Sequence, residues 1–271
     1  MKRLMLLLAL GWCLSAGAQE LYVYSEPASN MPAHSLTPKL TTLLDRTDRR
    51  TNQRYMAELM AGLSRRLMVH VGTSFSNMPA GSLRWESVYA YSKYRFLSND
   101  DVHRHFRMAA FAEAAYSRKT VQTDEVNFQG ERSGVQLGVI ATQLLGRMAL
   151  SATVSHSQAL DAERFDHNAA SPYPYQSLNY SLSGGLLVLP FNYTSYRQLN
   201  LNIYLELLGQ RTLDRKTSYT DLAPSIQFLF NSNSKLNLGY RFEVSGNQLR
   251  NMNRGFLLSF EHSFFNVIGK K

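Results

Sequence analysis

Apolar and polar residues alternate along most of the chain. Residues 199, 201, 203, 205 and 207 are Leu, Leu, Ile, Leu and Leu, and Asn, Asn, Tyr and Glu separate them. The same alternation recurs in residues 236–244 and 256–264. Successive side chains of a β-strand point to opposite faces of the sheet, so a period of two predicts strands with one apolar and one polar face.

Extended over the whole sequence, this pattern predicts about twelve strands in a single domain. Strands are expected at residues 35–44, 54–63, 66–76, 83–96, 103–117, 132–144, 147–157, 174–188, 198–209, 219–230, 235–245 and 254–265. The apolar face of the fourth strand is left open, because two sets of residues compete for it: Trp85, Tyr89 and Tyr91 against Val88, Ala90, Tyr94 and Phe96. No run of about 18 apolar residues suggests a membrane-spanning helix.

The connections between these strands differ systematically in length. Short turns follow the second, sixth and tenth strands, whereas long polar loops follow the fifth and seventh, at about 118–131 and 158–173. Transmembrane β-barrels have short periplasmic turns, longer outer loops and an even number of strands. The sequence therefore predicts an all-β, antiparallel, up-and-down transmembrane barrel with both termini in the periplasm.

The polar faces of the predicted strands carry more charge than a dry core would hold. We expect eight charged residues to line a lumen: Lys39, Glu58, Arg107, Glu113, Glu206, Arg241, Glu243 and Glu261. On the apolar face of the fifth strand, Phe106 and Tyr116 flank smaller side chains and would lie about 25 Å apart along the membrane normal, the height of a lipid band. Both features favour a membrane barrel over a secreted β-sandwich or a lipocalin-like barrel.

Closure of the barrel would bring the two ends of the chain together. An open sheet edge in lipid leaves backbone groups unpaired, so the last strand must pair with the first. Arg241, Glu261, Lys39 and Glu58 would then lie on consecutive strands with alternating sign. Opposite charges on neighbouring strands stabilise a sheet, which predicts an interior charge ladder across the seam, although separate hydration of each charge in a wet pore is an alternative.

The N-terminus has the three parts of a secretory signal peptide. Lys2 and Arg3 precede the apolar run 4–14, and the small residues 16–18 follow, with cleavage expected after Ala18. Cleavage would remove the single cysteine, Cys13, so the exported chain could be neither a thiol enzyme nor a disulfide-stapled protein. The expected organisation is a signal peptide at 1–18, a periplasmic segment leading into the barrel at 19–34, the barrel at 35–265, and a C-terminal tail at 266–271.

Charge composition then narrows the class of partner. The 271 residues include 29 Lys and Arg against 20 Asp and Glu, for a net charge of +9. Nucleic acid is an unsuitable partner for an exported barrel, whereas lipopolysaccharide phosphates suit Arg and Lys. We expect contacts with lipopolysaccharide from Arg49 and Arg50, near the first outer loop together with Arg46 and Arg54, and from Arg215 and Lys216 in the fifth.

No arrangement of residues predicts a catalytic, cofactor-binding or metal site. The pairs His156-Ser157 and His262-Ser263 are adjacent in strands, so their side chains point to opposite faces and cannot form a nucleophile–base pair. Met31, His34, His103, His105 and Met108 could be considered as soft-metal ligands, but Met108 falls on the opposite face from the two neighbouring histidines. An enzyme is therefore a minority hypothesis.

With these features the chain resembles the small, porin-like outer-membrane β-barrel proteins of Gram-negative bacteria. The resemblance covers nearly all of the exported chain and includes the final strand, 255–265, with its aromatic residues. It implies recognition by the barrel-insertion machinery through a terminal aromatic, here Phe264 or Phe265. Residues 22–36 are similar to the start of uncharacterised barrels in this group.

Three functions fit a barrel of this kind. The first is a narrow pore or substrate channel, because twelve strands lie between barrels filled by side chains and open aqueous channels. The second is an occluded structural or accessory barrel of an envelope complex. The third is an enzyme acting on lipid at the rim.

Overall fold

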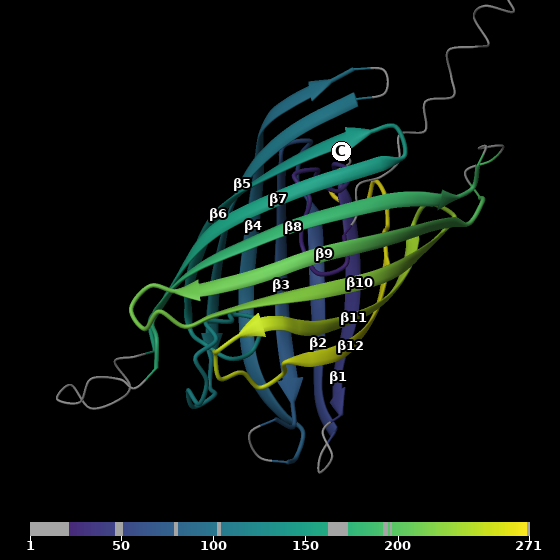
Figure 1. Ribbon diagram of the computed structural model, residues 1–271. Helices are drawn as coiled ribbons and strands as arrows, with labels where there is room; N and C mark the ends of the chain where they lie inside the picture. The colour runs from purple at the N-terminus through teal and green to yellow at the C-terminus, as the bar shows by residue number, and fades with distance from the viewer. Residues whose placement is uncertain are drawn as a thin grey trace, which may run out of the picture.

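The computed structural model describes residues 22–46, 51–78, 81–101, 104–161, 173–191, 195 and 197–269. These residues form a closed, all-antiparallel β-barrel in which each strand pairs with its neighbours in sequence (Figure 1). The strands are β1 Ser35–Arg46, β2 Thr51–Gly62, β3 Leu67–Ser76, β4 Arg84–Asp100, β5 Arg104–Ser117, β6 Gly134–Leu145, β7 Met148–Ala159, β8 Gln176–Leu189, β9 Asn200–Thr212, β10 Ser218–Phe230, β11 Ser234–Gly246 and β12 Arg254–His262.

Each predicted strand has a counterpart in the barrel, and the differences lie at the ends. The second begins at Thr51 rather than 54, and the fourth continues to Asp100 rather than 96. The alternation of apolar residues marks only the part of a strand with one apolar face. Backbone pairing continues beyond that part, into regions where both faces are polar.

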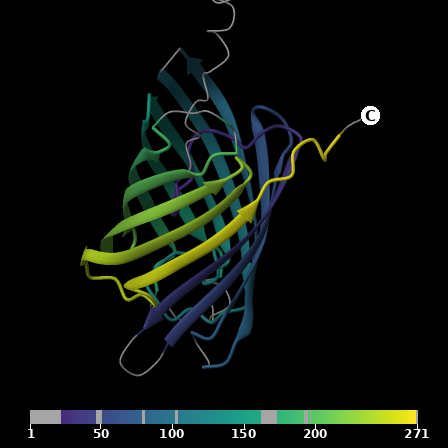
Figure 2. The ribbon, with the colours of Figure 1, turned by 90° about the vertical axis from the view of Figure 1, so that its right-hand side faces the viewer.

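The barrel closes through antiparallel pairing of β1 with β12. Lys39 lies opposite Glu261 and Leu44 lies opposite Phe256, with continuous register between them. Figure 2 shows the yellow β12 beside the purple β1. Closure pairs the backbone groups of both end strands, as a barrel in lipid requires.

The two faces of the wall differ in polarity. Leu205, Leu238 and Leu258 are exposed on the outside, while Ser259 and Glu261 are buried on the inside of β12. The same division settles the face of β4, where Tyr89 and Tyr91 point inward and Tyr94 and Phe96 point outward. A register shift between β3 and β4, where Phe75 pairs with Trp85, separates Trp85 from the alternation of the later tyrosines.

The connections divide between the two ends of the barrel. The described residues of the even-to-odd connections, 63–66, 101, 146–147, 190–191, 195, 197–199 and 231–233, lie at one end, here called the turn end. The described residues of the odd-to-even connections, which include 118–133, 160–161 and 173–175, lie at the other, here called the loop end. The described residues contain no helix that is long and apolar enough to cross a membrane.

A charge on the outer face of β12 should destabilise the protein in a bilayer. Leu258 lies at the centre of the strand and is 47% exposed. We expect Leu258→Lys to lower the free energy of unfolding from phospholipid vesicles by about 2–4 kcal/mol, the cost of Lys at the midplane. Leu249→Lys is the matched control, because Leu249 is exposed in the loop-end connection between β11 and β12 and should tolerate the charge. Equal losses in both variants would contradict a lipid-facing wall.

Candidate functional site

The chain segment before β1 lies inside the barrel. We call residues 22–31 the plug. The carboxylate of Glu206 on β9 accepts hydrogen bonds from the backbone N–H groups of Val23, Tyr24 and Ser25, with N to O distances of 3.0, 2.9 and 2.9 Å. The Ser25 hydroxyl also donates to this carboxylate at 2.6 Å. Hydrogen bonds to an ionised acceptor are stronger than neutral ones, so one buried side chain holds the first turn of the plug.

Two more strands hold the second half of the plug. The Lys93 ammonium on β4 donates to the carbonyls of Pro27 at 2.6 Å and Ser29 at 3.0 Å, and lies 3.0 Å from Glu26 Oε2. Burial acts to raise the pKa of Glu26, but the nearby cations, first Lys93, outweigh it and lower that pKa to about 2. The Ala28 N–H donates to Thr142 on β6 at 2.8 Å.

The position of the plug differs from the expectation for this region. The sequence suggests that 19–34 is a periplasmic segment leading into the barrel, and residues 22–31 of it lie inside the lumen. The plug lacks the alternation that marks strands, and its own residues do not predict which strand residues it contacts. The useful signal lies elsewhere: Glu206 and Lys93 occupy polar faces, where buried charges need partners.

A loop enters the lumen from the loop end. The connection between β5 and β6, residues 118–133, folds back over the barrel interior, and we call it the inner loop. Val126 and Phe128 within it are each only 3% exposed. Gln210 on β9 bonds both backbone groups of Val126, accepting from its N–H at 2.9 Å and donating to its carbonyl at 3.0 Å. The sequence predicts this loop as long and polar, but not that it lies inside.

A buried ion cluster fixes the inner loop to the wall. Arg54 on β2 reaches Glu131 of the loop at 2.8 Å and Glu86 on β4 at 3.1 Å. Lys119 lies 3.5 Å from Glu86 and 3.7 Å from Glu131. Burial acts to raise the pKa of Glu131, but Lys119 and Arg54 outweigh it and lower that pKa to about 2.

A second ion cluster closes the same end beside β10 and β11. Two nitrogens of the Arg250 guanidinium donate hydrogen bonds to the Asp221 carboxylate, at 2.7 and 2.8 Å. One of them also donates to the Glu243 carboxylate at 2.5 Å. Arg241 bonds the same Asp221 carboxylate and lies 3.9 Å from Glu125 of the inner loop. Asp221 is completely buried, so its charge depends on these two guanidinium groups.

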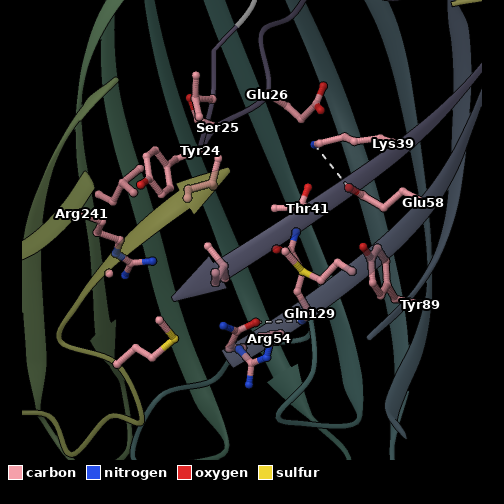
Figure 3. Close-up of a pocket in the computed structure, with 18 of the residues that line it drawn as sticks. Tyr24, Ser25, Glu26, Lys39, Thr41, Arg54, Glu58, Tyr89, Gln129 and Arg241 are labelled. Carbon is pink, nitrogen blue, oxygen red and sulfur yellow. Dashed lines mark hydrogen bonds and ion pairs between the residues drawn. The ribbon is translucent and has the colours of Figure 1, made fainter. Parts of the chain in front are cut away.

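Between the plug and the inner loop lies a cavity of about 210 Å³. Figure 3 shows Tyr24, Ser25 and Glu26 of the plug above it and Gln129 and Arg54 below it. Its walls carry both charges and aromatic rings: Lys39, Glu58, Glu113, Arg241, His70, Tyr89 and Tyr91. The cavity is therefore a mixed polar and aromatic chamber. Strands form its walls, and the plug and the inner loop close its two ends.

The structure distributes the eight expected lumen residues over four environments. Four line the cavity, namely Lys39, Glu58, Glu113 and Arg241. Glu206 and Arg107 contact the plug, the latter through Ser29. Glu243 pairs with Arg250, and Glu261 borders a smaller cavity of about 80 Å³ beside the plug.

The expected charge ladder across the seam has a different member at one end. Lys39 is the Cα partner of both Glu261 and Glu58, and its ammonium lies 3.3 Å from the Glu58 carboxylate. On the β11 side of Glu261, its Cα partner is Lys235, whose ammonium lies 2.6 Å from the Glu261 carboxylate. Arg241 is the Cα partner of Gly255. Arg241 is thus displaced along β11 toward the loop end, because alternation fixes the face of a residue, and a shift of two residues along the strand leaves that face unchanged.

The basic residues expected to contact lipopolysaccharide are only partly described. Arg215 and Lys216 are exposed in the turn between β9 and β10. Arg49 and Arg50 lie outside the described residues. Arg54, grouped with them by sequence proximity, is instead buried in the ion cluster.

One Ser–His contact appears at the turn end. Ser234 Oγ lies 2.7 Å from His262 Nδ1 across the β11–β12 pair, so the serine partner comes from the neighbouring strand rather than from Ser263. Ser234 also contacts Asn233 at 3.2 Å. No hydrogen bond from another described residue orients the His262 ring, so the pair lacks the third group that catalytic arrangements use. Among the described residues no group of three or more His, Cys, Asp or Glu could hold a metal ion.

Comparison with solved structures supports the fold. The COG4313 outer membrane channel from Pseudomonas putida F1 is similar with a TM-score of 0.61, at 16% identity, over 90% of this chain and 100% of that one. The KdgM porin follows with a TM-score of 0.49, at 8% identity, over 84% of this chain and 99% of that one. At 16% identity, the similarity to the COG4313 channel shows a shared fold. No protein-family model matches the chain, and no curated protein matches its sequence significantly.

Removal of the central guanidinium of the first ion cluster should release the inner loop. Arg54→Met keeps the length of the side chain but leaves Glu86 and Glu131 with only Lys119, and an uncompensated buried charge is strongly destabilising. We expect trypsin to cleave after Lys119 at least tenfold faster in this variant, as measured by mass spectrometry of timed digests. Arg84→Met removes an exposed arginine at the same end and should leave the rate unchanged. Identical rates in the two variants would contradict the role of the cluster.

Proposed function

We propose that this protein is a narrow substrate channel of the outer membrane, closed in the structure by its plug and its inner loop. One observation carries the proposal: the lumen is obstructed by two segments that are not part of the wall and that attach to it through polar contacts. A barrel with a permanently filled interior needs no such segments, because strand side chains can fill it.

The nature of the plug contacts makes opening feasible. Each hydrogen bond of the plug can be exchanged for one with water, so its net contribution is small, about 0.5–1.5 kcal/mol for neutral pairs and somewhat more for charged ones. The wall itself depends on backbone pairing around the complete ring and would not change. Movement of the plug would therefore open a path from the turn end to the cavity without any change in the barrel.

The alternative of an occluded structural barrel rests on the extent of these contacts. Residues of β4, β5, β6, β8 and β9 bond the plug, and two ion clusters border the inner loop, which would suit a lumen that stays closed. The two hypotheses differ in one measurable property, the conductance of the barrel after the plug is loosened.

Substitution of the plug anchor should open the channel. Glu206→Ala removes the acceptor of three backbone N–H groups, and we expect it to raise the single-channel conductance in a planar bilayer severalfold over the wild type. Asp214→Asn, a comparable loss of charge in the β9–β10 turn outside the cavity, is the control and should behave as the wild type. If the Glu206→Ala barrel is folded and does not conduct, the protein is an occluded barrel and not a channel.

This function implies a specific orientation and set of envelope contacts. The turn end would face the periplasm, and the signal peptide would be cleaved near Ala18. The barrel-insertion machinery would recognise the terminal aromatic, Phe264 or Phe265. The loop end would face the lipopolysaccharide leaflet, where Arg49, Arg50, Arg215 and Lys216 would contact phosphates.

Loss of these four basic residues should weaken lipopolysaccharide binding. We expect the quadruple replacement by Gln to reduce the binding of the purified barrel to immobilised lipopolysaccharide, with the largest difference at low salt, because exposed charges are screened at high ionic strength. Replacement of Arg65 and Arg66, at the turn end, is the control and should have little effect. Binding that is unchanged at low salt would argue against the proposed contacts.

A further inference from the structure

One wall of the cavity carries polar atoms that no described residue satisfies. His70 on β3 pairs in register with Tyr91 on β4, and Tyr91 pairs with Glu113 on β5. The three residues are between 5% and 9% exposed. His70 Nε2, the Tyr91 hydroxyl and Glu113 Oε1 have no hydrogen-bond partner among the described residues. Buried polar groups are normally paired, so three unpaired ones in a single row point to an occupant.

The adjoining row extends this wall. Gly72 lies opposite Tyr89, and a Cβ at position 72 would come within 2.3 Å of the Tyr89 ring. Glycine there allows the Tyr89 ring to lie against the wall. The wall thus offers two phenol hydroxyls, an imidazole nitrogen and a carboxylate to the same cavity.

Three of the cations that line the cavity are paired with other carboxylates. Lys39 is paired with Glu58 at 3.3 Å, Arg54 with Glu131 at 2.8 Å, and Arg241 with Asp221. No cation lies within 4.0 Å of Glu113 in the described parts of the chain. The charged group that acts on Glu113 is a second carboxylate, Glu58. Two carboxyl groups thus adjoin on this wall, and a cation bound beside them would favour the ionised form of Glu113.

We propose that this wall is a binding site for a small organic amine in its cationic form. An ammonium group carries only donors, which match the Glu113 carboxylate, the Tyr91 hydroxyl oxygen and His70 Nε2 when the ring holds its proton on Nδ1. Its hydrocarbon part would lie against the rings of Tyr89 and Tyr24. A cavity of about 210 Å³ is smaller than the pockets that hold drug-sized ligands, so the occupant is a short molecule.

This inference rests on the proposed channel function and deepens it, because it assigns the class of solute that the channel carries. A neutral polyol could use the hydroxyl groups as well, but it would bring no positive charge to the Glu113 carboxyl group. Binding of a diamine and of the diol of equal length separates the two, since they differ in charge and not in size.

The test is calorimetric titration of the purified full-length barrel in detergent, at low ionic strength, with 1,4-diaminobutane and with 1,4-butanediol. We expect one diamine per barrel, and diol binding at least tenfold weaker. Glu113→Gln should lower the affinity for the diamine at least tenfold, since a charge-assisted hydrogen bond is lost. Tyr91→Phe, which removes only the hydroxyl, should lower it about threefold. Asp100→Asn, the same chemical change as Glu113→Gln outside the cavity, should leave it unchanged.

Several results would overturn the site: no diamine binding to the wild type, equal affinity for diamine and diol, or a folded Glu113→Gln barrel with undiminished affinity. If Glu113→Gln does not fold, as judged by circular dichroism and heat-dependent gel mobility, the Tyr91→Phe and diol comparisons decide. The channel function is measured separately, as potassium chloride conductance of Glu206→Ala without amine. Conductance without diamine binding refutes the site alone, whereas diamine binding without conductance refutes the channel and leaves the site.

Discussion

The closed ring of backbone hydrogen bonds is the constraint on which the rest of this structure depends. Each strand pairs on both sides, and the last pair, β12 with β1, removes the only edges that twelve strands would otherwise leave. Once the ring is complete, the outer face is free to be apolar because no backbone polar group faces outward unpaired. The inner face must then receive all the polar side chains of the alternation, and these charges need partners inside.

The plug and the inner loop enter the lumen from opposite ends of the barrel and supply these partners. Glu206 accepts hydrogen bonds from backbone N–H groups of the plug, Lys93 donates to carbonyls of the plug, and Arg54 donates to a carboxylate of the inner loop. These three strand charges are thus neutralised or solvated by segments that are not strands. The contacts that pair the charged side chains of the wall also restrict the lumen to a small cavity. Charge pairing and obstruction of the lumen therefore have the same structural cause.

The sequence predicts the wall well and the lumen poorly, and the reason is physical. Alternation is a local property, so the faces of β9, β11 and β12 can be assigned from a few neighbouring residues. Closure follows from the demand that no edge remain in lipid. The partners of Glu206 lie more than 180 residues away in the chain, and no local period connects them. The same holds for the displacement of Arg241 from the seam, which depends on strand register rather than on face.

The plug has a further consequence for the order of assembly. Its anchors, Lys93, Thr142 and Glu206, come from β4, β6 and β9, strands spread around the ring, although the plug itself precedes β1 in the chain. These anchors converge only when the strands between them have paired, since contacts between distant parts of a chain form after the loops that join them close. The plug, which precedes the barrel in the chain, therefore takes its place only after the strands that hold it have paired.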